Sequence, residues 1–262
     1  MGGLFGGGGS QNTTNAPAVS SLRIQTTTLG RCIPWVFGTA RVAPNLIQHD
    51  DFKSIAHTEK QRAGGKGGGG GSITNTTYTY TAALVLSVCR GEIDGFGRIW
   101  KGKDIKNTQT LNLDAYTGSP TQMPHPHWQV NHPEKALAYR GLAYLASSAY
   151  DLGDSGEVPS HNVEVFTKTR ISSSIPDANL AVVLSTILSD KESGLGIDTA
   201  SRVDLTEFSN YCLANSIWIS PTFDEQVAAH EIITRIAEIG HSAVINSEGR
   251  LKLLPYSDTP AS

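Results

Sequence analysis

The sequence predicts an α+β protein that is mainly β, because its 262 residues favour short strands and turns over long helices. Glycine and proline occur 27 and 12 times, which suits many turns. Residues 78–89 alternate apolar and polar side chains with the period of two that marks a strand. Apolar residues at helical spacing begin only after Pro176. The predicted organisation is a Gly-rich N-terminal arm (1–20), a β-rich domain (21–175) and a small helix-containing α+β domain (176–262).

Charge and hydropathy exclude several classes of protein. The net charge is -3, so the chain lacks the basic excess expected of a stable nucleic-acid binder. No stretch approaches 18 consecutive apolar residues, which argues against a membrane span, and the first residues carry no secretion signal, so we expect assembly in the cytoplasm. Because no cysteine pair has C-x-x-C spacing, we predict small buried hydrophobes at Cys32, Cys89 and Cys212.

The N-terminal part carries glycine-rich segments. Residues 1–20 have little apolar surface to bury, so we expect an arm that is flexible or that orders only against a neighbour. After an extended segment broken by Pro34, residues 35–42 predict an apolar strand with Gly38 at a bulge or close contact. Glycines near 62–75 predict a mobile hairpin loop. A P-loop is excluded there because five glycines follow Lys66, where a helix would have to begin.

Four strands make the predicted core of a sheet or small barrel. Residues 78–89 should be half-buried, with threonine and serine opposite the apolar face. Turns at 91–97 and 101–105 predict that the chain returns through a second strand and begins a third, and residues 162–168 predict another. The apolar face of the first strand should hold Tyr78, Tyr80, Ala82, Leu84, Leu86 and Val88, and that of the last Val163, Val165 and Thr167.

Three helices are predicted after residue 176, each opening at an aspartate that can cap it: Asp177, Asp204 and Asp224. The third should end at Gly240. Residues 243–254 then predict a β-hairpin. The apolar stripes are Leu180, Val183, Leu184, Ile187 and Leu188, then Leu205, Phe208 and Cys212, then Val227, Ile232, Ile236 and Ile239.

The densest group of possible metal ligands is His125, His127 and His132. Residues two apart on a strand share a face, so a zinc site is geometrically conceivable. Prolines flank the first histidine, and no nearby cysteine or spaced carboxylate supplies a fourth ligand, so a surface loop is the better interpretation. Acidic pairs at Asp50–Asp51 and Asp151–Asp154 could suggest acid–base chemistry or calcium binding. The second pair lacks calcium-loop spacing, and turn formation is the better interpretation.

No other motif indicates catalysis. The chain contains no G-x-S-x-G nucleophile elbow, and His241 suits the end of a helix. We therefore assign no catalytic, cofactor-binding or metal residue and expect a protein that is not an enzyme. Aromatic side chains that we expect to pack in a core or at a subunit interface are Trp100, Trp128, Tyr139, Tyr144 and Tyr150.

Several segments in fixed order carry a resemblance to a known family. Residues 33–42 match an I-P-x-x-x-G-x-x-R-V opening, and a strand-like run leads to Gly91-Glu92-Ile93-Asp94-Gly95. The others are Tyr116-Thr117-Gly118 with Thr121-Gln122, Ala138-Tyr139-Arg140-Gly141-Leu142-Ala143-Tyr144, Asp151-Leu152-Gly153, 159–166 and 249–253. Together they resemble the central tail-hub, or tail-tip host-specificity, protein of long-tailed phages and gene-transfer particles.

The resemblance implies a structural virion protein at the tail tip, a baseplate hub with tube-forming, β-barrel-like domains. It implies a homotrimeric ring that joins the tail tube to distal fibre or receptor-binding parts and helps gate or line the channel for genome ejection during host cell entry. Implied partners are the distal tail protein, the tape-measure protein and tail-fibre proteins, with DNA passing through unbound. Such hubs usually run much longer, with fibre-like modules downstream.

Two alternatives stay open. One is a tail-associated cell-wall hydrolase that uses the His125 region with a metal. The other is a component of a bacterial contractile injection system with the same architecture.

Overall fold

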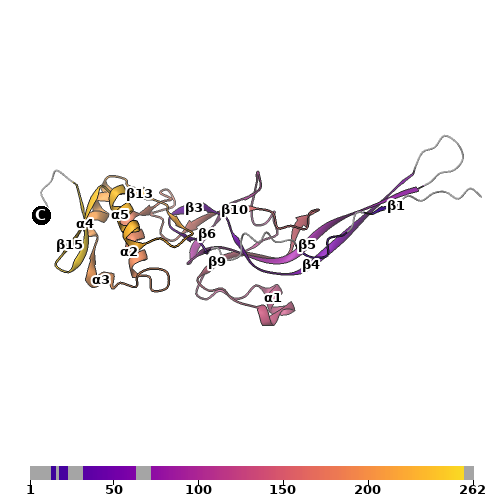
Figure 1. The fold of residues 1–262 in the computed structure, drawn as a ribbon, viewed down its shortest axis with the longest axis horizontal. Coiled ribbons are helices and arrows are strands. Elements are labelled where there is room, and N and C mark those ends of the chain that lie inside the picture. The colour runs from indigo at the N-terminus through magenta and orange to yellow at the C-terminus, as the bar shows by residue number, and fades with distance from the viewer. Residues whose placement is uncertain (1–12, 16–17, 23–31, 63–71, 257–262) are drawn as a thin grey trace, which may run out of the picture.

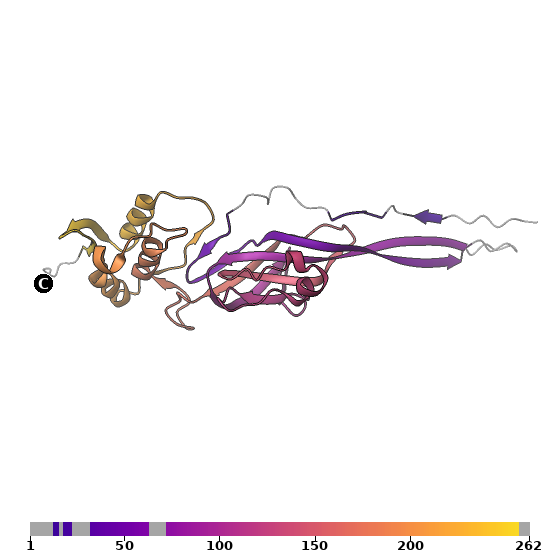
Figure 2. The ribbon, with the colours of Figure 1, turned by 90° about the horizontal axis from the view of Figure 1, so that it is seen from below.

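A computed structural model of the chain describes residues 13–15, 18–22, 32–62 and 72–256. The molecule is elongated, with the helices of the C-terminal part at one end and a two-stranded ribbon reaching out at the other (Figures 1 and 2). It is α+β and mainly β, as predicted. The strands are β1 (Thr13–Asn15), β2 (Trp35–Val36), β3 (Thr39–Val42), β4 (Asn45–Arg62), β5 (Ser72–Arg90), β6 (Ile93–Lys101), β7 (Asp104–Lys106), β8 (Asp114–Thr117), β9 (Leu142–Gly153), β10 (His161–Thr167), β11 (Ala178–Asn179), β12 (Val203–Asp204), β13 (Trp218–Ile219), β14 (Thr222–Phe223), β15 (Ser242–Ser247) and β16 (Arg250–Pro255). The helices are α1 (Pro126–Asn131), the 3-10 turn η2 (Pro133–Lys135), α2 (Leu180–Ser189), α3 (Thr199–Arg202), α4 (Thr206–Ala214) and α5 (Ala229–Ile239).

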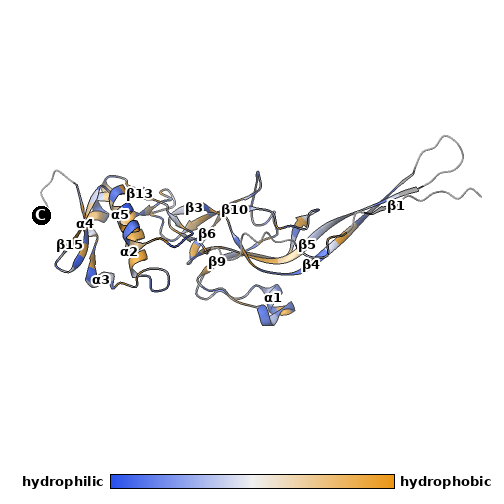
Figure 3. Cartoon of the chain, viewed as in Figure 1, coloured by the Kyte–Doolittle hydropathy of each residue, from blue (hydrophilic) through white to orange (hydrophobic). Residues whose placement is uncertain are grey.

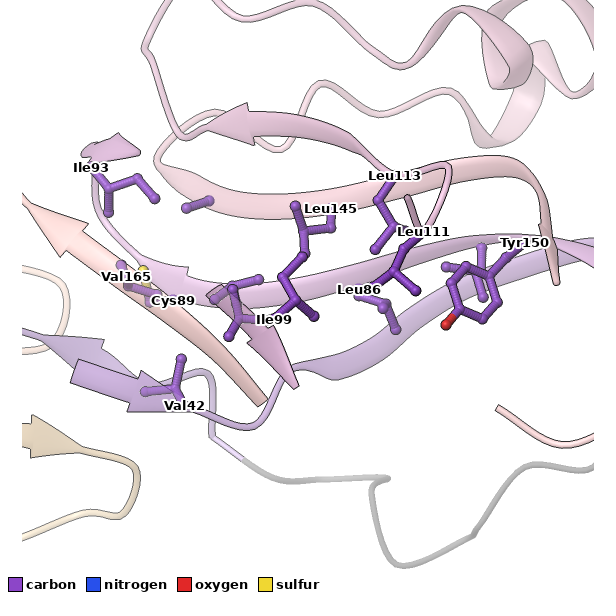
Figure 4. Packing of buried hydrophobic residues seen from close by; sticks show 14 of the residues in the cluster. Val42, Leu86, Cys89, Ile93, Ile99, Leu111, Leu113, Leu145, Tyr150 and Val165 are labelled. Atoms are coloured by element: carbon purple, nitrogen blue, oxygen red, sulfur yellow. The ribbon is translucent and has the colours of Figure 1, made fainter. Parts of the chain in front are cut away.

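Two sheets enclose the first core. In the larger, β5 pairs antiparallel with β4 and β9 and parallel with β1 and β2, and β8 and β14 complete the sheet. The smaller has the order β3-β10-β6-β7. Figure 4 shows their side chains meeting, with Leu86 and Leu145 from the larger sheet opposite Ile99 and Val165 from the smaller. The predicted burial of Val163, Val165 and Thr167 is confirmed.

From residue 80 to residue 89, strand β5 is buried on both faces, where the sequence predicted a half-buried strand. The predicted apolar face is confirmed, since its residues from Tyr80 to Val88 lie in the first core. The opposite face is also covered, because Ala83 and Val85 pack against Trp128 and Tyr144 in a separate cluster. Helix α1 supplies this cover (Figure 1).

Strand β6 does not return beside β5, so the hairpin interpretation of residues 91–97 was wrong. It pairs with β10 and β7 in the smaller sheet. Ile93 and Ile99 face the first core from that opposite layer, which the turn at Gly91 (φ +90°) makes reachable. The tight turn that opens β7 is confirmed by the Lys101–Asp104 pair.

The predicted strand 35–42 is divided at Gly38. β2 belongs to the larger sheet and β3 to the smaller. Gly38 has φ +64°, and a Cβ there would lie 3.1 Å from the Asp177 Cα, so the expected close contact is confirmed. The division sends neighbouring side chains in different directions: Val36 lies in the first core and Phe37 in the second.

The second core lies between the helices and the β12-β16-β15 sheet. The predicted stripe of α2 is confirmed, as is the burial of Phe208 and Cys212. The prediction that Asp177 caps α2 was wrong. Asn179 is the N-cap and accepts the Ala181 N–H at 2.8 Å, while Asp177 accepts a hydrogen bond from the Ser220 hydroxyl. A cap must directly precede its helix, and α2 begins at Leu180.

The third helix begins later than predicted. Helix α5 starts at Ala229 with Ala228 as N-cap, and the chain from Asp224 approaches it without helical structure. Gly240 is the C-cap, as predicted, and Ile236 is buried, but Ile239 is exposed. The final hairpin is confirmed as β15 and β16, turning at Glu248 and Gly249, which both have positive φ.

The cysteines differ in environment. Cys89 and Cys212 are buried as predicted, and burial raises the pKa of their thiols to about 12 and about 11. Cys32 is exposed, so the prediction for that residue was wrong. It lies just before β2, where the chain has not yet entered either core.

Several strands were not predicted from the sequence, among them β8, β9 and, before the glycine loop, β4. Strand β4 is 18 residues long and pairs with β5 up to Arg62–Ser72, so strand structure continues into the range assigned to the loop.

Residues 63–71 and most of the predicted arm (1–12 and 16–17) lie outside the described residues. Thr13–Asn15 form β1 on this chain's own β5, and the Val19 N–H donates to Tyr80 Oη at 2.9 Å.

Candidate functional site

The distal half of the β4–β5 hairpin, residues 53–62 and 72–79, extends beyond both cores and is called the ribbon below. The pairing of β9 with β5 ends at Tyr80. Among the strands that the structure describes, residues 72–79 of β5 therefore pair with β4 and, at 74–76, with β1. Eight residues at about 3.3 Å each carry it roughly 25 Å outward. Figure 3 shows mainly pale and blue colours along this part and more orange on α2.

The ribbon presents an open edge. β4 pairs only with β5 among the strands that the structure describes, and the side chains of residues 53–60 are exposed. Ile55 is an exposed apolar residue between them. An edge of this length, with unpaired backbone groups, is suited to contact with another chain.

A second feature, called the Gln122 junction, joins the segments on which the family resemblance depends. The Gln122 amide donates to the carbonyls of Ala138 (2.8 Å), Tyr139 (2.6 Å) and Leu142 (3.2 Å), and its oxygen accepts the Gly118 N–H at 3.0 Å. Gly141 N–H donates to Gly118 O and Gly91 N–H to Gly141 O. The quoted glycines and glutamine therefore hold three loops together.

The aromatic residues of this region pack beside the junction. Tyr116 and Tyr144 stack with centroids 4.4 Å apart, and Tyr139 meets Tyr144 edge-on at 5.6 Å. Trp128, Tyr144 and Tyr150 are buried, which confirms a packing role for these three. The Tyr139–Tyr144 segment that the resemblance emphasises is therefore built into the outer face of the larger sheet.

Three possible metal ligands converge at the base of the ribbon, where β4 has a bulge between Asp50 and Lys53. Asp51 Oδ2 lies 2.8 Å from His127 Nε2 and 3.0 Å from His132 Nε2. The three side chains are 30%, 17% and 18% exposed. Hydrogen bonds from His132 and then His127 hold the pKa of Asp51 below its ordinary value. Sequence reasoning missed this carboxylate because it lies 76 residues before His127.

His125 belongs to a different contact. It is buried, its Nε2 lies 2.9 Å from Asp114 Oδ2, and its Nδ1 accepts the His127 N–H at 3.2 Å as the N-cap of α1. The surface-loop interpretation of 125–132 was therefore wrong, because the segment is a short helix that packs on the sheet through Trp128.

The predicted acidic pairs have local partners. Asp50 pairs with Lys135, and Asp151 accepts the Gly153 N–H, which confirms a turn role for Asp151.

The larger cavities lie elsewhere. One of about 560 Å³ lies between α2 and α4, and one of about 510 Å³ lies between β3 and residues 222–225. Neither is lined by the three converging ligands. No helix in the described part of the chain is long and apolar enough to cross a membrane.

Comparison with known proteins identifies a shared fold. No protein-family model matches the chain, and neither does any curated protein. Among solved structures, it is similar to a chain of the virion of a native gene transfer agent (GTA) particle, with a TM-score of 0.52 and 20% identity over 94% of its length. The match covers 58% of that longer chain. Almost the whole of this chain therefore has the fold of part of a protein found in a gene transfer agent virion.

Proposed function

We propose that this chain is a structural component of a phage-like or gene-transfer virion, and that it forms the hub at the tip of the tail. The observation that carries the proposal is the fold shared with a gene transfer agent virion chain over 94% of the present chain. A role without catalysis fits the Gln122 junction, in which Gln122 and the glycines at 91, 118 and 141 hold loops together.

The ribbon supports an assembly role. It places an exposed strand edge beyond the cores, and Tyr78, at its base, is the one ribbon side chain among the described residues that packs against the first core. Copies arranged in a trimeric ring would use the ribbon to reach a neighbouring subunit or the tube above. The proposed partners are further copies, the distal tail protein, the tape-measure protein and fibre or receptor-binding proteins. A net charge of -3 suits a channel that DNA crosses without stable binding.

The test is the mass of the purified chain in solution by light scattering, alone and with the tail protein encoded beside it. We expect a trimer or a complex containing one. A variant with Asn-Gly in place of residues 56–78 retains the Ile55–Thr79 pair, which a two-residue turn can close, and lacks the ribbon. It should fold and lose assembly.

Val244→Ser is the matched control, because it changes an exposed side chain of β15 at the opposite end of the molecule. It should assemble like the unmodified chain. An unmodified chain that stays monomeric in both measurements would contradict the hub proposal. Full assembly of the shortened variant would show that the ribbon is not the contact.

A second candidate is a tail-associated cell-wall hydrolase, favoured by the convergence of Asp51, His127 and His132. Clearing of peptidoglycan by the purified chain with Zn²⁺, abolished by Asp51→Asn, would support it. We expect no clearing.

A further inference from the structure

We propose that Asp51, His127 and His132 form a binding site for one first-row divalent transition-metal ion of the Zn²⁺ type, which links α1 to the base of the ribbon. The proposal concerns these three side chains and does not depend on the proposed function. It departs from the sequence-based expectation that the chain has no metal residue.

The three ligands come from two segments that are far apart in the sequence, β4 and α1. Asp51 lies in the β4 bulge with φ +51°, a conformation that aspartate and asparagine tolerate better than most residues. His127 is in the first turn of α1 and His132 is its C-cap, so both imidazoles lie on one short helix. Trp128, buried between them in sequence, anchors that helix to the larger sheet.

The donor atoms suit the ion. Two imidazole nitrogens and one carboxylate oxygen are ligands that zinc and its neighbours accept, whereas Mg²⁺ and Ca²⁺ prefer oxygen alone. The three donor atoms lie within 4.8 Å of one another. Zinc bonds of about 2.0–2.1 Å at tetrahedral angles would separate them by about 3.4 Å. The observed 2.8 and 3.0 Å contacts must lengthen by about half an ångström to admit an ion, and the two imidazole nitrogens, which lie within 4.8 Å of each other, must adopt the same spacing.

The surrounding groups are placed to orient the imidazoles. Asn131 Nδ2 lies 3.1 Å from His127 Nδ1, and Asp50 Oδ2 lies 3.8 Å from His132 Nδ1. When Nε2 of each ring binds an ion, Nδ1 carries the proton and needs an acceptor. Asp50 can accept that proton from His132. For His127, the Asn131 amide would have to present its oxygen, which gives up the donation of Nδ2 to His127 O at 3.1 Å. The partial exposure of all three ligands leaves a route for the ion.

The alternative is a hydrogen-bonded group without metal, in which both imidazoles donate to Asp51. In that case Zn²⁺ would bind no better than at any exposed histidine. The test is equilibrium dialysis of the chelator-treated full chain against Zn²⁺ alone, with the bound metal counted by mass spectrometry. We expect about one ion per chain and a melting temperature roughly 5 °C higher at saturation.

Three variants make the test specific. Asp51→Asn keeps the size and the backbone conformation of the residue and removes the charge, and His132→Gln removes one nitrogen ligand. Each should weaken binding by at least about tenfold, since a three-ligand site loses one donor. His230→Gln, at an exposed position of α5, is the matched control and should bind like the unmodified chain.

Circular dichroism with chelator present establishes that each variant is folded. Substoichiometric zinc in the unmodified chain, or equal binding by the unmodified chain and the folded Asp51→Asn and His132→Gln variants, would overturn the proposal. Mg²⁺ at the same concentration should not compete.

Discussion

At the scale of single residues, the clearest buried titratable contact is the pair of His161 and Tyr150 in the first core. His161 is 5% exposed, and its Nε2 lies 2.7 Å from Tyr150 Oη. Burial, and then the nearby charge of Lys101, lower the pKa of His161 to about 4 from 6.5. Burial also raises the pKa of Tyr150. The folded protein therefore holds His161 neutral at neutral pH.

This pair predicts a pH dependence of stability. The unfolded chain binds a proton at His161 below about pH 6.5, while the folded chain does so only below about pH 4. Above pH 6.5, protonation of His161 does not reduce the free energy of unfolding. As the pH falls from 6.5 to 4, that free energy decreases by about 3 kcal/mol at most. Urea unfolding between pH 4 and 7 measures it. His161→Gln, which can still bond Tyr150, should flatten the slope; an unchanged slope would mean that other groups cause it.

At the scale of elements, the Gln122 junction connects loops that are far apart in the sequence. The Gln122 side chain bonds backbone groups of two loops, at Gly118 and at 138–142, and the Gly91 N–H joins the third loop by donating to Gly141 O. Gly118 must lack a side chain because a Cβ would lie 2.5 Å from Gly91 O. The junction fixes where β8 ends and β9 begins.

Gln122→Ala should lower the free energy of unfolding by about 2–3 kcal/mol, because the hydrogen bonds of the amide to the carbonyls at 138, 139 and 142 are lost, although Tyr139 O keeps another donor, the Leu142 N–H. Gln122→Glu should cost at least as much, since a carboxylate would face the same carbonyls. Denaturant unfolding measures both. Gln129→Ala, at an exposed position on α1, is the control and should change stability little. A Gln122→Ala protein as stable as this control would contradict the role assigned to the junction.

At the scale of the whole molecule, contacts across the sequence connect the two cores. Phe37, from the β2–β3 segment, is 1% exposed within the second core and meets Phe223 edge-on at 6.0 Å. Arg90, at the end of β5, bonds Asp190 at 3.0 Å after α2. The helical end therefore depends on residues that precede their partners there by 100 positions or more.

Phe37→Ala should destabilise the second core by about 3–4 kcal/mol, the cost of a large cavity. Native-state hydrogen exchange should show lost protection in α2 and β16, with β9 and β10 affected less. Phe96→Ala, at a partly buried position beside the first core, should give the reverse pattern. Equal loss of protection in both regions would mean that the two cores unfold as one unit.

The candidate sites were predictable only in part. The histidines at 127 and 132 stood out because they are close in sequence. Asp51 could not be connected with them, because the bulge that turns it toward α1 depends on the pairing of β4 with β5. The ribbon was missed for a related reason: residues 53–60 are mostly polar and exposed on both faces, so β4 has little of the alternation that marks a strand.

The sequence by itself determined the fold class, the buried faces of β5, β10 and α2, and the final hairpin, because local side-chain periodicity and turn residues control those features. Only the tertiary structure decided that β6 joins the opposite sheet, that Phe37 crosses to the second core and that Asn179 caps α2. These depend on contacts between residues far apart in the chain, whose free energy no local pattern records. The convergence of Asp51 with His127 and His132 is of the same kind.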